Sequence, residues 1–106
     1  MTTIDASDDS IHVFGHSGYA PEGLDIVCCA ISTLTESLDR YLRITDNQVE
    51  STKDDGEYTI YLNKINATGK SLIDEYNMMI DEIIKDYPRY VRRINYGKIR
   101  EARKIR

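Results

Sequence analysis

The clearest fold signal lies in residues 25–42, DIVCCAISTLTESLDRYL. Apolar residues recur there at helical spacing and form one stripe, made of Val27, Ile31, Leu34, Leu38 and Tyr41 or Leu42. Asp25 is a typical N-cap, because its carboxylate can accept the backbone N–H groups two or three residues further on. The stretch therefore predicts an amphipathic helix that begins after Asp25 and packs one face against a core.

Alternation of apolar and polar residues predicts strands on both sides of this helix, over residues 1–7, 10–15, 48–52 and 58–63. A second amphipathic helix is predicted over about 68–87, where Pro88 stops it. The order strand–strand–helix–strand–strand–helix is typical of an α/β domain. We expect a small, mostly antiparallel four-stranded sheet with two helices packed on it. Residues 90–96 are either a last short strand or an irregular segment.

A chain of 106 residues is long enough for one domain, but its charge is unevenly distributed. Residues 1–88 hold 17 Asp and Glu against 6 Lys and Arg, whereas residues 89–106 hold 8 basic residues against Glu101 alone. This division predicts a folded domain over 1–88 and a basic C-terminal segment over 89–106. The acidic body would attract a basic substrate, and the basic segment could contact nucleic acid.

The sequence predicts a cytoplasmic protein without a membrane span. No apolar run is long enough to cross a bilayer, and Asp5, Asp8 and Asp9 interrupt any signal peptide. Two adjacent cysteines also differ from the spread cysteines of a secreted disulfide scaffold.

Chemically versatile side chains gather where the second predicted strand leads into the first helix. Cys28 falls in the first helical turn, where free N–H groups and the helix dipole favour a thiolate and could bind an oxyanion. Cys28 lies at the edge of the apolar stripe, whereas Cys29 points away from it. His16 ends the preceding strand, and the loop between His16 and Cys28 is long enough to bring the two together. A small buried hydrophobe remains the alternative reading of Cys28.

A metal site is a weaker interpretation of the same residues. His12 and His16 have a spacing known from zinc sites, but on a strand they lie about 13 Å apart and cannot share an ion. A disulfide between Cys28 and Cys29 would require a backbone distortion that a helix does not allow. We therefore expect no metal and no other cofactor.

The stretch resembles the signature of the ribosomal-processing cysteine protease family, Prp. The resemblance rests on Gly15-His16, Gly23, Asp25-Ile26-Val27-Cys28, Ala30 and Ser32. It implies a cytoplasmic, homodimeric cysteine endopeptidase. Its substrate in the family is the N-terminal extension of ribosomal protein L twenty-seven, or a capsid or scaffold protein in phage members.

Carried over by residue, the resemblance implies that Cys28 is the nucleophile and His16 the general base and acid. Asp25 has two readings, a helix cap or a partner that orients His16, and Ser32 could hydrogen-bond the sulfur. Ser17 stands where the family usually has alanine. The glycines implied to shape a substrate loop that closes over the cleft are Gly15, Gly18 and Gly23.

A second hypothesis is a non-catalytic module that binds the ribosome or RNA through the basic segment. Such a module would need aromatic residues among its charges, and only Tyr90 and Tyr96 lie near them.

Overall fold

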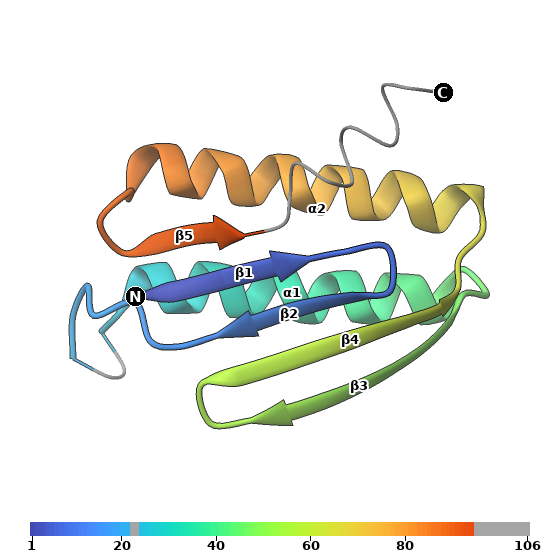
Figure 1. Ribbon diagram of the computed structural model, residues 1–106, viewed down its shortest axis with the longest axis horizontal. Coiled ribbons are helices and arrows are strands. Elements are labelled where there is room, and N and C mark those ends of the chain that lie inside the picture. Colours follow the sequence, from blue (N-terminus) through green and yellow to red (C-terminus); the bar gives the residue numbers. More distant parts are fainter. Residues whose placement is uncertain (22–23, 95–106) are drawn as a thin grey trace.

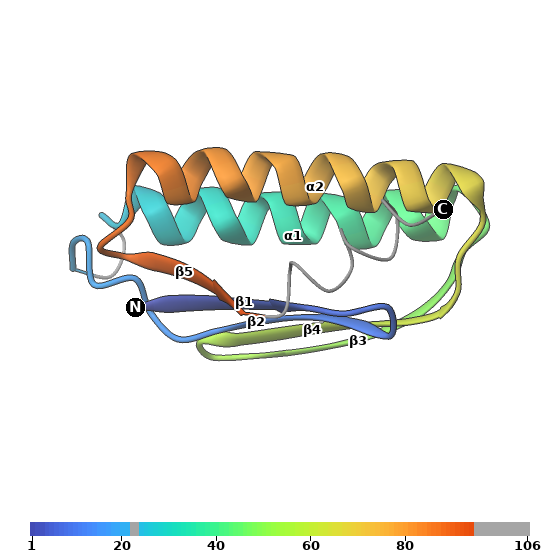
Figure 2. The same cartoon turned by 45° about the horizontal axis from the view of Figure 1, so that its top comes forward.

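The computed structural model describes residues 1–21 and 24–94, and in it two helices cover one face of a five-stranded sheet (Figures 1 and 2). The elements in chain order are β1 (Thr2–Ala6), β2 (Ser10–Phe14), α1 (Ile26–Ile44), β3 (Gln48–Asp54), β4 (Glu57–Lys64), α2 (Ala67–Asp86) and β5 (Val91–Ile94). The predicted α/β class, the two hairpins and the two helices are confirmed. No helix within the described ranges is both long and apolar enough to cross a membrane.

The sheet differs from the prediction in having five strands rather than four. Its order is β3-β4-β2-β1-β5, and β5 pairs in parallel with β1 while the other pairings are antiparallel. Residues 91–94 join the edge because Val91 is buried in the core and Arg93 reaches α2. The Arg93 guanidinium donates to the side-chain oxygen of Asn77 at 2.9 Å and to Asp81 at 3.2 Å. Residues 95–106 of the basic segment lie outside the described residues.

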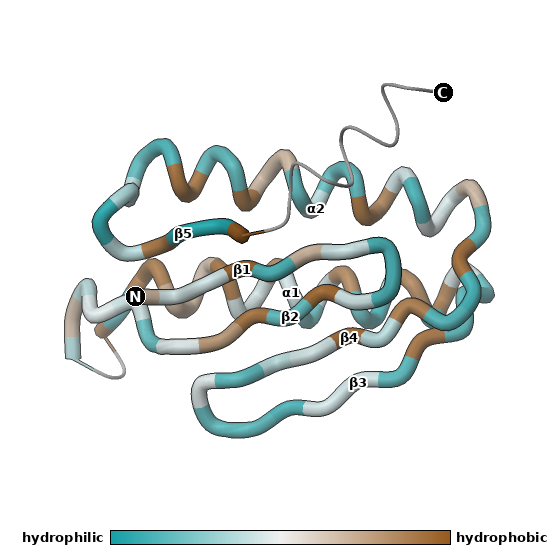
Figure 3. The backbone as a smooth tube through the Cα atoms, in the orientation of Figure 1, coloured by the Kyte–Doolittle hydropathy of each residue, from teal (hydrophilic) through white to brown (hydrophobic). Residues whose placement is uncertain are grey.

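The core lies between the sheet and the apolar faces of α1 and α2, whose apolar positions recur along both helices (Figure 3). Ile4 and Ile60 from the sheet are fully buried, as is Leu42 from α1. The two helices are also joined by a polar contact, since the Tyr76 hydroxyl lies 2.9 Å from Oγ1 of Thr35. Burial raises the pKa of Tyr76 to about 12, so this phenol stays protonated.

One asparagine connects the end of α1 to the start of α2. The Asn47 side-chain amide donates to the carbonyl of Leu42 at 3.1 Å, and its oxygen accepts the N–H of Asn66 at 2.8 Å. Asn66 in turn caps α2 by accepting the N–H of Gly69. The position of α2 is therefore set by side chains that follow α1 directly.

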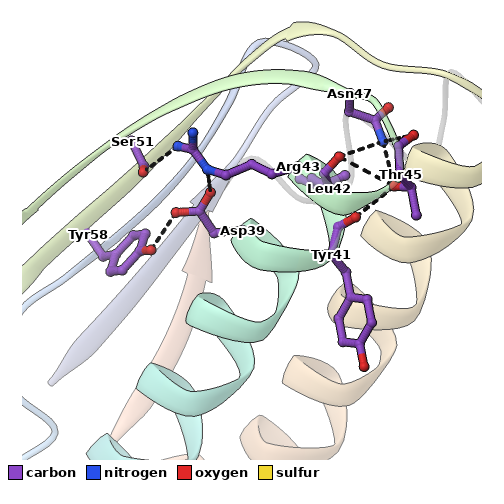
Figure 4. A network of polar contacts seen from close by, with 8 residues as sticks. All are labelled: Asp39, Tyr41, Leu42, Arg43, Thr45, Asn47, Ser51 and Tyr58. Carbon is purple, nitrogen blue, oxygen red and sulfur yellow. Dashed lines mark hydrogen bonds and ion pairs between the residues drawn. The ribbon is translucent and has the colours of Figure 1, made fainter.

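Asp39 joins the middle of α1 to the β3–β4 hairpin (Figure 4). Only 7% of this residue is exposed, and its carboxylate accepts the Tyr58 hydroxyl at 2.6 Å and the Arg43 guanidinium at 2.8 Å. Arg43 also donates to the hydroxyl of Ser51 on β3. Burial by itself raises the pKa of Asp39, but hydrogen bonds from Tyr58 and Ser51 and the nearby Arg43 outweigh it and lower the pKa.

Replacing Tyr58 by phenylalanine should lower the free energy of unfolding by about 1.5 kcal/mol at neutral pH, because a hydrogen bond to a carboxylate is lost. The contribution of Asp39 is fully present above its unfolded pKa near 4 and is lost as the pH falls through its lower folded pKa. The difference between the two proteins should therefore shrink at about pH 3. Urea unfolding at both pH values measures it, and exposed Tyr61→Phe on the same strand should change little at either.

Candidate active site

Asp25 caps α1, as predicted, and also fastens the preceding loop to it. Its Oδ1 accepts the backbone N–H groups of Val27 at 3.0 Å and of Cys28 at 2.9 Å. Its Oδ2 accepts the Ser17 hydroxyl at 2.5 Å and the N–H of Ala20 at 3.4 Å. Burial acts to raise the pKa of Asp25, but the hydrogen bonds, with that from Ser17 foremost, outweigh it and lower the pKa. Asp25 is therefore a carboxylate at neutral pH.

The backbone N–H groups that take part in capping α1 are the ones that the sequence suggested as donors to an oxyanion. The N–H groups of Val27 and Cys28 both bond the Asp25 side chain, and the N–H of Cys29 bonds the Asp25 carbonyl at 3.1 Å. These three groups are not free for a substrate while Asp25 holds the helix start, so that expectation is wrong for this arrangement.

Cys28 is half-buried at the start of α1 and faces Ser17. The Ser17 backbone N–H donates to the Cys28 sulfur at 3.3 Å, and the Ser17 hydroxyl oxygen lies 3.4 Å from the same sulfur. Both cysteines are free thiols, and Cys29 is exposed on the helix surface. Within the described residues, the hydrogen bonds to a cysteine sulfur in this region are those of Cys28 with Ser17.

His16 lies on the same loop segment, with its imidazole against the β3–β4 turn. A Cβ added at Gly56 would lie 2.8 Å from Nε2 of His16, and the N–H of Gly15 donates to the Gly56 carbonyl at 2.8 Å. The imidazole is exposed, and within the described residues no hydrogen bond joins it to Cys28. The residue that contacts the sulfur is its neighbour Ser17.

The remaining predicted site residues are Ser32 and three glycines of the loop. Ser32 is exposed one turn after Cys28, and no hydrogen bond between the two occurs in the part of the chain that the structure describes. Gly15 and Gly18 both adopt positive φ, at 92° and 74°, which favours glycine. Gly23 lies outside the described residues.

An aromatic contact ties the loop to the far end of α2. Tyr19 packs edge-to-face on Tyr87 and Tyr90, with ring centroids 5.5 and 5.3 Å apart. Such pairs stabilise by about 1 kcal/mol each. In the described conformation, the loop after His16 is therefore held by Tyr19 as well as by the Asp25 contacts.

Substitutions at Gly56 test where the His16 imidazole lies. Alanine there should cost about 1 kcal/mol of stability, because φ is +70°, and should displace the imidazole through its Cβ. Asparagine tolerates this φ better but carries the same Cβ. We expect NMR signals of the imidazole ring to shift in both variants, with only the alanine variant clearly less stable, as thermal unfolding measures. Unchanged ring signals in both would contradict the contact between His16 and Gly56.

A family of known proteins matches the part of the chain that holds these residues. The family model described as cysteine protease Prp matches residues 1–92. The chain belongs to this family. It is therefore a cysteine protease, which excludes the interpretation as a purely non-catalytic binding module. No relative was found among curated protein sequences.

Solved structures share the fold. The ribosomal processing protease Prp from S. aureus, with a covalently linked product peptide, superposes with a TM-score of 0.79 at 20% identity, covering 88% of this chain and 97% of that one. The same protease with a substrate peptide gives 0.67 at 17% identity, covering 88% and 95%. A protein from Streptococcus mutans gives 0.66 at 25% identity, covering 87% and 89%.

Proposed function

We propose that this Prp-family chain is an endopeptidase in which Cys28 is the nucleophile and His16 the general base and acid. The supporting observation is the position of the Cys28 sulfur, half-buried at the helix start and contacted by the Ser17 backbone N–H at 3.3 Å. His16 directly precedes Ser17, and the proposal requires its side chain to turn from Gly56 toward the sulfur while Ser17 keeps its contacts.

The reaction is acyl transfer to sulfur. The Cys28 proton passes to the His16 imidazole while the sulfur bonds to the peptide carbonyl carbon, and the imidazolium then protonates the leaving amine. A water molecule deprotonated by His16 hydrolyses the thioester and regenerates the thiol. The Ser17 N–H donates to the sulfur before the reaction, and as the sulfur bonds to the carbonyl carbon this N–H would turn from the sulfur to the oxyanion.

The proposed substrate is the N-terminal extension of ribosomal protein L twenty-seven. Support comes from the family resemblance and from the S. aureus relative, which is a ribosomal processing protease solved with a substrate peptide. The acidic body, with 17 Asp and Glu against 6 Lys and Arg in residues 1–88, suits a basic ribosomal protein. A capsid or scaffold protein, the substrate of phage family members, is the alternative. We further propose that the enzyme works in the cytoplasm as a homodimer.

The experiment is incubation of the purified chain with the precursor of ribosomal protein L twenty-seven from the same host. Mass spectrometry should find one cut that removes the extension, while the mature ribosomal protein stays intact. The host's or phage's capsid and scaffold proteins are tested in parallel, and cleavage of these alone would transfer the assignment to them. Cleavage that persists with Cys28→Ala would show a contaminating protease. Light scattering of the same sample measures whether the enzyme is a dimer.

A further inference from the structure

Ser17 is buried between the two groups that define the helix start. Only 3% of the residue is exposed, and its hydroxyl lies 2.5 Å from Oδ2 of Asp25 and 3.4 Å from the Cys28 sulfur. The backbone N–H of Tyr19 donates to the same hydroxyl oxygen at 3.2 Å. The backbone N–H of Ser17 donates to the Cys28 sulfur.

These contacts determine where each hydrogen lies. A serine hydroxyl has one donor and two acceptor positions. Asp25 is a carboxylate at neutral pH and can only accept, so the Ser17 hydroxyl donates to it. Tyr19 occupies one acceptor position, and the lone pair that remains faces the Cys28 sulfur. A thiol can donate into that lone pair while its sulfur accepts the Ser17 N–H. A thiolate would keep the contact with the N–H, but the lone pair and the carboxylate behind it would repel its charge.

We propose that Ser17 is a positioning residue that holds Cys28 as a protonated thiol in the resting enzyme. The inference rests on the proposed role of Cys28 as the nucleophile and adds the protonation state of that nucleophile before substrate binds. Donation to Asp25 polarises the Ser17 hydroxyl and makes its oxygen a better acceptor for the thiol. Cys28 is then ionised only when His16 takes its proton during attack, and no preformed thiolate–imidazolium pair is needed.

Other charged groups near this end of the molecule are engaged elsewhere. The His12 imidazole of β2 lies 2.8 Å from the Glu57 carboxylate of β4, and Lys53 of β3 pairs with Glu36 of α1. Within the described residues, the titratable groups of the segment around Cys28 are Asp25, His16, Tyr19 and exposed Cys29, and Tyr87 and Tyr90 pack on Tyr19. Glu22 lies outside the described residues. Of these titratable side chains, only Asp25 is linked to the sulfur through Ser17.

The test uses Cys29→Ser as the parent, so that Cys28 is the one thiol of the chain, which has two cysteines. Infrared spectroscopy of the folded parent at neutral pH should show an S–H stretching band that disappears when Cys28 is alkylated. An absent band would mean that Cys28 is already a thiolate, and it would overturn the proposal. This measurement needs no substrate, so it stands apart from success or failure of the cleavage experiment.

The second measurement is the pH profile of iodoacetamide alkylation with Ser17→Ala added. Loss of the acceptor should move the acid limb of the profile to lower pH and make alkylation about fivefold faster near pH 6. Simple exposure of the sulfur would instead raise the alkaline plateau and leave the acid limb in place. Ser37→Ala, which removes a half-buried hydroxyl elsewhere on α1, is the matched control. An unmoved acid limb in Ser17→Ala would overturn the proposal, and if this variant does not fold, the infrared band of the parent decides.

Discussion

Cys28→Ala is expected to lower the rate of peptide cleavage by on the order of 10⁴-fold or more, because no acyl-enzyme can form without the sulfur. The fold should survive the change. Cys28 is only half-buried, and alanine keeps the backbone N–H that Asp25 accepts at 2.9 Å. Cleavage of the precursor by equal amounts of folded enzyme, checked by circular dichroism, measures the effect.

Cys29→Ala is the matched control, since it removes the same thiol from the next position of the same helix. Cys29 is exposed, and we expect its variant to stay within about twofold of the unmodified rate. Loss of cleavage in Cys29→Ala alone would assign the nucleophile to the other sulfur. Loss in both variants would instead point to a disturbed helix start.

The helices and hairpins were predictable because their signals are local. Asp25 and the apolar stripe that follows define α1 within 18 residues, and Asp25 indeed accepts the N–H groups of Val27 and Cys28. Strand β5 was less certain, because four residues carry little periodicity. Its place depends on partners remote in sequence, namely β1 and, through Arg93, the side chains of Asn77 and Asp81 on α2.

The sequence indicated which residues make up the candidate site but not how their side chains are arranged. The spacing of His16 and Cys28 predicts that the loop returns to the helix start, where Ser17 contacts the Cys28 sulfur. The position of the His16 imidazole depends instead on the path of the loop. That path is set by contacts with distant residues, such as the Gly15 N–H on the Gly56 carbonyl and Tyr19 on Tyr87. From the sequence, Ser17 stood out only as a serine where the family usually has alanine. A hydroxyl residue beside the candidate base, eight positions before a capping aspartate, was the available signal.

Ile31→Ala is expected to lower the free energy of unfolding by about 3 kcal/mol. Ile31 is 2% exposed and belongs to the core cluster between α1 and the sheet, so truncation leaves a cavity as well as losing apolar burial. Small domains are stable by only about 5–15 kcal/mol, so this one substitution should remove a large part of the total. Urea unfolding followed by circular dichroism measures it.

Ile44→Ala makes the same chemical change on the same helix, but Ile44 is 64% exposed. Its effect should be within about 0.5 kcal/mol, because no packed cavity forms and little apolar surface returns to water. Equal losses in the two variants would mean that α1 contributes mainly by helix propensity rather than by packing. A large loss confined to Ile31 would show that α1 is stabilised mainly by its core packing, since the cap at Asp25 and its bonds to Ser17 are untouched by either change.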